Sequence, residues 1–150
     1  DHVWRNLSLS FPAGTDFFLE IAKLKAFRIL WYQTAQAFGL TDYGPSDVKI
    51  HVRSVPWVTE GYQPHGNLLK STGTALSAVL GGCDTLTIEP EDEFNPTMNR
   101  IARNVSSIIR EEANLGMVSD PLAGAYAIEN MVDKIAEAAW LEFQLQMSQA

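Results

Sequence analysis

The feature of this sequence that most constrains its fold is a regular alternation of strand-like and helix-like segments. The strand-like segments begin near residues 7, 48, 84 and 117, so each strand with its following helix takes roughly 33 to 41 residues. That length is typical of a β-α-β repeat. Alternation of this kind indicates a parallel sheet covered by helices. The sequence therefore predicts an α/β fold of about four βα units over residues 1–150, with no linker that divides the chain into two domains.

Local signals place the boundaries of these elements. The predicted strands are residues 6–11, 48–55, 83–90 and 117–121, and the predicted helices are 16–38, 66–80, 95–115 and 125–147. Asp16 or Thr15 is the expected N-cap of the first long helix. Asn95-Pro96 opens another helix, with proline at the first helical position, where its missing N–H costs little.

The predicted strands have a polar side opposite their apolar side. In an ordinary eight-stranded barrel the inward side chains are Val, Ile and Leu, so small polar residues on one side suggest a channel that admits a ligand. An open sheet with water on its polar face also fits the pattern, although a closed barrel is the more economical arrangement. Four units make half of such a barrel, and we expect the C-terminal half of a (βα)8 TIM-type barrel. The residues expected to line the channel are Ser8, Ser10, His51, Arg53, Thr85 and Thr87.

Composition excludes several classes of function. The formal net charge is −7 and no basic block occurs, so nucleic acid and anionic membranes are poor partners. No apolar run approaches the ~20 residues that a membrane span requires. Cys83 is the only cysteine, which rules out an internal disulfide and suits the reducing cytoplasm. We expect it to be a buried structural thiol.

Generic catalytic signatures are missing, and the chain begins "DHVWRNLSLSF", which looks like a cut inside a longer protein. An acidic cluster at residues 88–94 is compatible with a metal site or an acid–base pair, but a solvated loop before a helix is the preferred interpretation. The four tryptophans are expected to be packing anchors, and they are Trp4, Trp31, Trp57 and Trp140.

Longer stretches carry a specific resemblance. The strings "DFFLEIAKLKAFRILW", "GGCDTLTIEPEDEF" and "RIARNVSSIIREEANLGMVSDPLAGAYAIE" resemble the methylmalonyl-CoA mutase family, from about residue 5 to residue 145. Enzymes of this family use adenosylcobalamin radical chemistry to interconvert methylmalonyl-CoA and succinyl-CoA. Their substrate domain is a (βα)8 barrel through whose axis the pantetheine chain of CoA passes. The resemblance implies that this chain supplies barrel units five to eight.

The chain departs from the family's catalytic pattern at two strands. Catalytic chains carry H-x-Q-T-S-G-W on the sixth strand; His51 and Trp57 match this pattern, but Arg53 replaces the glutamine. On the seventh strand the pattern S-L-H-T-N-S-x-D-E-A faces the corrin, and here its His and Asn are lost and bulky Phe94 replaces the alanine. The corrin-facing positions of the degenerate site that the resemblance marks are Thr87, Glu89, Glu93 and Phe94, of which Glu93, like Asp92, keeps the residue of the pattern.

These departures imply a non-catalytic small subunit that supports a homologous large subunit. Adenosylcobalamin is then expected in the large subunit, with no cofactor and no metal in this chain. In this interpretation Arg53 fills the axis and pairs with a carboxylate such as Glu89 or Glu93. A half-barrel also has two open strand edges, so we expect the isolated fragment to self-associate.

Two alternatives remain open at this point. In the first alternative, the chain is half of a catalytic acyl-CoA mutase with altered specificity, and Arg53 binds a substrate carboxylate or a CoA phosphate. Otherwise it is a CoA-binding module without cobalamin. Corrin binding and acyl-CoA binding distinguish the three interpretations.

Overall fold

The sheet has three parallel strands, with the chain running from one to the next in spatial order. The computed structural model describes residues 2–55 and 66–149. Strand β2 (Lys49–Ser54) lies between β1 (Ser8–Ala13) and β3 (Thr85–Thr87). In register, Ser10 pairs with His51, and His51 pairs with Thr85. Three of the four predicted strands are thus confirmed, and the parallel α/β class is correct.

Helices α2 (Phe17–Ala37), α3 (Gly66–Leu80) and α4 (Pro96–Glu111) each follow a strand, as the alternation predicts. Asp16 caps α2 by accepting a hydrogen bond from the N–H of Leu19, and Asn95 caps α4 in the same way with Thr97. Both caps were expected from the sequence. The helical elements are α1 (His2–Arg5), α2 (Phe17–Ala37), the short 3-10 helix η1 (Pro45–Asp47), α3 (Gly66–Leu80), α4 (Pro96–Glu111) and α5 (Tyr126–Ser148).

The predicted fourth strand, at residues 117–121, is wrong. This segment forms turns, in which the N–H of Met117 donates to the carbonyl of Asn114. Met117 and Val118 are 81% and 59% exposed, so the segment has no apolar side to bury against the helices. Pro121 also has no N–H to give to a neighbouring strand. The described residues contain three strands, and the last helix does not follow a fourth.

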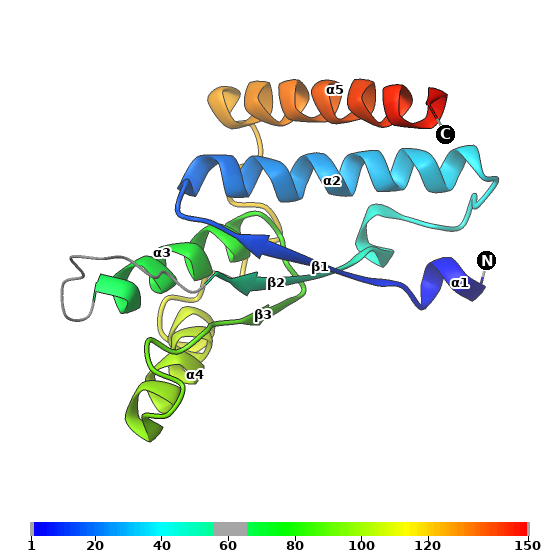
Figure 1. Cartoon of the computed structure of the whole chain (residues 1–150). Coiled ribbons are helices and arrows are strands. Elements are labelled where there is room, and N and C mark those ends of the chain that lie inside the picture. The colour runs from blue at the N-terminus through cyan, green and yellow to red at the C-terminus, as the bar shows by residue number, and fades with distance from the viewer. Residues whose placement is uncertain (1, 56–65, 150) are drawn as a thin grey trace.

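Helix α5 instead packs on α2, on the side away from the sheet (Figure 1). Leu24 of α2 is buried in the core between α2 and the sheet, with Ile50 and Val52 of β2. Ile21 of α2 is buried in a second core with Val132 of α5. Helix α2 is therefore covered on both sides, which explains why its apolar residues are spread around the helix instead of forming one stripe.

Arg28 joins the loops at the amino ends of β2 and β3. Its guanidinium is half-buried and lies 3.2 Å from the carboxylate of Asp84. It also donates to three backbone carbonyls, at 2.7, 3.0 and 2.6 Å, which belong to Pro45, Val48 and Gly82. One side chain of α2 thus satisfies three carbonyl groups from two separate loops.

Two side chain to backbone contacts fix β2 against β3 at opposite ends. At the amino end, the Asp84 carboxylate accepts from the N–H of Ile50 at 2.8 Å, while the N–H of Asp84 donates to the carbonyl of Ile50 at 2.8 Å. At the carboxyl end, the buried hydroxyl of Ser54 accepts from the N–H of Glu89 at 2.8 Å. The outer edges of β1 and β3 have no strand beside them in the described part of the chain. Self-association through these edges stays a prediction.

The tryptophans differ in their surroundings. Trp4 packs on Trp31 with ring centroids 4.8 Å apart, and the indole N–H of Trp31 donates to the hydroxyl of Tyr43. These two are packing anchors, as predicted. Trp140 is 41% exposed, and Trp57 lies outside the described residues. Along the ranges that the structure describes, no helix combines the length and apolar character of a membrane span.

Candidate functional site

The candidate site is the polar face of the sheet, opposite the helices. Along β2, Ile50 and Val52 are fully buried, whereas Lys49 and Arg53 are exposed. The same alternation holds in the neighbouring strands, where serine and threonine side chains occupy the exposed positions. The structure therefore brings all the predicted channel residues onto one face, and they are Ser8, Ser10, His51, Arg53, Thr85 and Thr87.

His51 joins the three strands across this face. Its Nδ1 lies 2.7 Å from the hydroxyl oxygen of Ser10 on β1. Its Nε2 lies 2.9 Å from the hydroxyl oxygen of Thr87 on β3. A hydroxyl can donate or accept a hydrogen bond, so either tautomer of the imidazole satisfies both contacts. Both ring nitrogens are thus engaged within the protein.

Arg53 forms an ion pair with Glu89 beside this histidine. The sequence predicted pairing with Glu89 or Glu93, and the pairing with Glu89 is confirmed. The N–H of Glu89 donates to the Ser54 hydroxyl, and this bond fixes the backbone that carries the Glu89 carboxylate at the carboxyl end of the sheet. The arginine side chain is 61% exposed, and such a pair contributes at most about 1 kcal/mol to stability. The pair matters for the site because the guanidinium of Arg53 and the carboxylate of Glu89 bind each other there.

The remaining predicted positions lie in the loop after β3. The side chain of Phe94 is 88% exposed, and its N–H donates to the carboxylate of Asp92. Phe94 and Glu93 line a pocket of about 450 Å³ together with Arg103 of α4. Thr87 and Glu89 are thus bonded to His51 and Arg53 on the sheet face, whereas Glu93 and Phe94 line the pocket beside α4. Trp57 cannot be placed, because it lies outside the described residues.

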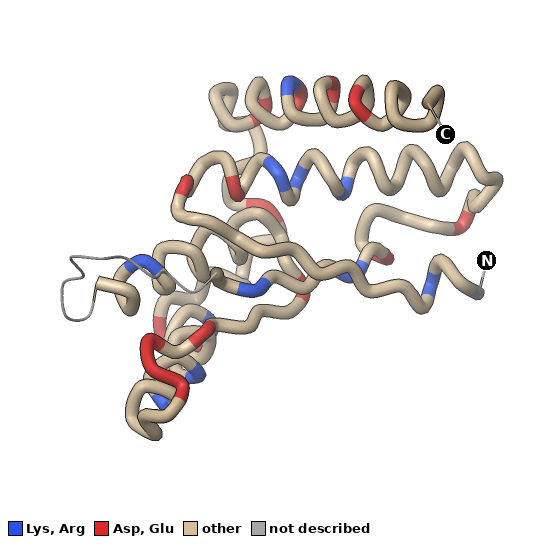
Figure 2. Tube along the Cα trace, in the orientation of Figure 1, with Lys and Arg blue, Asp and Glu red and all other residues tan. Residues whose placement is uncertain are grey.

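Charge is unevenly distributed over the molecule. Figure 2 shows acidic residues, in red, gathered in the loop that leads from β3 into α4. Within the described ranges, no three His, Cys, Asp or Glu side chains are placed to share a metal ion. In this loop Asp92 and Glu93 are exposed, whereas Glu89 is paired with Arg53. The solvated interpretation of the whole cluster stays a prediction.

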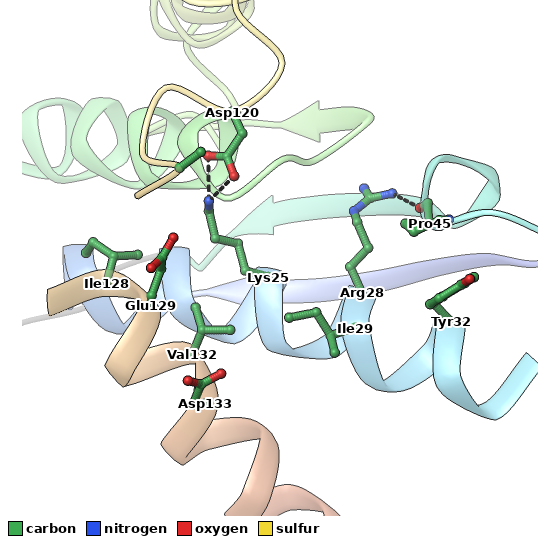
Figure 3. Close-up of a pocket in the computed structure, with 11 residues that line it drawn as sticks. Lys25, Arg28, Ile29, Tyr32, Pro45, Asp120, Ile128, Glu129, Val132 and Asp133 are labelled. Atoms are coloured by element: carbon green, nitrogen blue, oxygen red, sulfur yellow. Dashed lines mark hydrogen bonds and ion pairs between the residues drawn. The ribbon is translucent and has the colours of Figure 1, made fainter. Parts of the chain in front are cut away.

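A pocket of about 460 Å³ lies elsewhere, between α2 and α5 (Figure 3). Lys25 and Ile29 line it from α2, and Ile128 and Asp133 line it from α5. Lys25 is held by both carboxylate oxygens of Asp120, at 2.5 and 2.6 Å. Sequence reasoning missed this pocket, although the apolar residues all around α2 signalled that a second layer covers it.

Cys83 is half-buried where the chain leaves α3 for β3. Burial raises the pKa of its thiol to about 11, and the negative charge of Asp84 acts in the same direction. We therefore expect slow reaction with iodoacetamide, because the thiolate is the nucleophile. At pH 8 the folded protein should react about 100-fold more slowly than the urea-unfolded chain, since the pKa lies two units above its ordinary value of 9.0. Mass-spectrometric time courses measure both rates, and equal rates would contradict the burial of the thiol.

Fold and site together define a class: an α/β protein whose parallel sheet has helices on one face and a bonded polar ladder on the other. The sequence model of the family described as methylmalonyl-CoA mutase matches residues 1–147. The chain therefore belongs to the methylmalonyl-CoA mutase family.

Similar proteins include both full mutases and small subunits. The chain is 38% identical to methylmalonyl-CoA mutase of Escherichia coli over 89% of its length, covering 19% of that protein. It is 33% identical to the methylmalonyl-CoA mutase small subunit of Porphyromonas gingivalis over 95% of its length, covering 24% of that protein. With the small subunit of Streptomyces virginiae the identity is 35%, over 93% of this chain and 23% of the relative. The chain thus spans about a fifth to a quarter of the relatives it matches, and overall identity does not separate the two kinds.

Proposed function

We propose that this chain is part of a non-catalytic small subunit of adenosylcobalamin-dependent methylmalonyl-CoA mutase. Its role is to support a large subunit that interconverts methylmalonyl-CoA and succinyl-CoA. Several similar proteins carry the name small subunit, which supports a large-subunit partner. The sheet, with helices on one face and small polar side chains on the other, supports membership of the C-terminal half of a (βα)8 barrel, to which the described residues contribute three strands.

One observation carries the non-catalytic role. At the carboxyl end of the sheet, the positions that differ from the catalytic pattern bind each other: Arg53 is paired with Glu89. His51, which matches the pattern, has both nitrogens engaged by Ser10 and Thr87. A substrate carbonyl or carboxylate would have to displace these partners before it could be bound.

The same residues are a poor fit for a corrin. Thr87 and Glu89 stand where the catalytic pattern has His and Asn. The carboxylate of Glu89 is already bound by Arg53, and Glu89 does not offer the neutral amide of the pattern. The bulky ring of Phe94 projects from the loop at a position where the pattern has alanine. These features support the interpretation that adenosylcobalamin is bound by the partner and not by this chain.

The proposal is tested by titrating the full-length protein with adenosylcobalamin and following the corrin absorbance. We expect no spectral shift and no saturable binding at micromolar concentration. A full-length family member that carries both catalytic patterns serves as the positive control. Micromolar binding with a shifted spectrum would reject the small-subunit assignment and favour the altered-specificity mutase.

A further inference from the structure

The pocket between α2 and α5 is part of a longer groove. A second pocket of about 260 Å³ adjoins it and shares Ile29 and Asp133 with it. Together the two pockets form what we call the α2–α5 groove, which extends along both helices as far as Trp140. Its apolar lining includes Ile29 and the buried Val132, while the indole of Trp140 is 41% exposed.

One wall of the groove is acidic. Glu129, Asp133 and Glu137 are spaced four residues apart on α5, and all three line the groove. Residues at this spacing lie on the same face of a helix. Figure 3 shows Glu129 and Asp133 on α5, across from the residues of α2. The row of carboxylates therefore runs parallel to the groove.

The cations of the groove do not neutralise this row. Lys25 is bound by both carboxylate oxygens of Asp120. The guanidinium of Arg28 donates to the Asp84 carboxylate and to three backbone carbonyls. The carboxylate of Glu129 accepts one backbone N–H, from Gly124, which carries no positive charge. Among the residues that the structure describes, no ion pair involves Asp133 or Glu137. The groove therefore has an apolar floor and an unneutralised negative edge.

We propose that the α2–α5 groove binds an amphipathic helix of a partner protein that carries a basic row beside its apolar stripe. Lys or Arg side chains four residues apart on such a helix repeat about every 6 Å. The carboxylates of Glu129, Asp133 and Glu137 repeat at the same interval, because they have the same spacing on a helix. The apolar stripe enters the groove, and Trp140 supplies an aromatic anchor of the kind enriched at binding hot spots. This inference does not depend on the proposed loss of cofactor binding.

The test uses a synthetic helical peptide of about 18 residues, long enough to be helical when bound. It has a leucine stripe and lysine at every fourth position, and the control peptide has glutamate in place of lysine. Calorimetric titration into the full-length protein is expected to show binding of the lysine peptide only. Equal binding of both peptides, or binding of neither, would overturn the proposal.

Two variants locate the binding site on the protein. Asp133→Asn combined with Glu137→Gln keeps the side-chain shapes and should weaken binding of the lysine peptide about tenfold or more. Glu142→Gln is the matched control, because Glu142 lies on the same helix, rotated by about half a turn from the acidic row, and its carboxylate accepts from Gln146. An equal loss in both variants would overturn the proposal. So would conversion of a dimer to a monomer by the double variant in sedimentation, since the groove would then bind a second copy of the chain.

Discussion

Replacement of Arg28 with methionine is expected to lower the free energy of unfolding by about 3 kcal/mol. Methionine keeps most of the apolar stem but removes the guanidinium. The variant leaves the carboxylate of Asp84 without its principal cation and removes the donor from three backbone carbonyls. Partly buried polar groups that lose their partners cost more than the lost bond itself, because water cannot fully replace the donor. Urea unfolding followed by circular dichroism measures the difference.

The matched control is Arg110→Met. Arg110 is paired with Glu111, but the two side chains are 76% and 66% exposed. Exposed pairs of this kind contribute little, and we expect a change of about 0.5 kcal/mol or less. If the two variants lost similar stability, the guanidinium of Arg28 would not be the link between the loops that we describe.

The second large loss of stability is expected at Leu24, which is 1% exposed in the core between α2 and the sheet. Leu24→Ala should cost about 3 kcal/mol, from the lost burial and the cavity it leaves. This side chain also determines what Gly81 tolerates. A Cβ at Gly81 would lie 2.9 Å from Cδ1 of Leu24 and 3.1 Å from the carbonyl oxygen of Ser77.

Gly81→Ala alone should therefore destabilise the protein by about 2 kcal/mol through overpacking. In the Leu24→Ala background this cost should fall by about 1 kcal/mol, because the shortest of the three close contacts disappears while those to the Ser77 carbonyl and to Cβ of residue 24 remain. Gly73→Ala is the control: it lies inside α3 with no described atom within 4 Å of a built Cβ. It should stabilise the protein by about 0.5–1 kcal/mol. Strict additivity of the Leu24 and Gly81 changes would contradict the packing described for α3 against α2.

Sequence reasoning was most successful where one residue type determines one local structure. Alternation predicted β1, β2 and the polar face, and the caps at Asp16 and Asn95 set two helix starts. The pairing of Arg53 with a carboxylate was expected from the family resemblance, which places the arginine in a barrel axis that no longer admits substrate. Each of these depends on a few residues close in sequence or on adjacent strands.

The predictions failed where distant segments decide the outcome. Residues 117–121 have two apolar residues and then Asp120-Pro121, and whether such a stretch forms a strand depends on a neighbour that can bury it. The role of Arg28 was missed because its partners lie up to 56 residues away, in two separate loops. The groove between α2 and α5 required knowing that α5 covers α2, which periodicity alone does not reveal.

The bonded ladder of Ser10, His51 and Thr87 has a consequence for how the strands find each other during folding. Hydroxyl residues recur two positions apart on both flanking strands, at Ser8 and Ser10 and at Thr85 and Thr87. A shift of one residue would turn the hydroxyls toward the helices. A shift of two residues, by contrast, can present His51 with another hydroxyl, from Ser8 in place of Ser10 or from Thr85 in place of Thr87. The ladder therefore selects the orientation of each strand but tolerates even-numbered misalignment.

Correct alignment of β2 with β3 must then come from the contacts at their ends. The reciprocal bonds between Asp84 and Ile50, and the bond from Glu89 to Ser54, each involve one particular backbone position. A two-residue shift would break both contacts as they stand and require Asp84 and Ser54 to find other backbone partners. The contacts that favour the observed alignment of β2 with β3 are therefore those of Asp84 and Ser54, which lie outside the ladder. His51 distinguishes only one side of the sheet from the other.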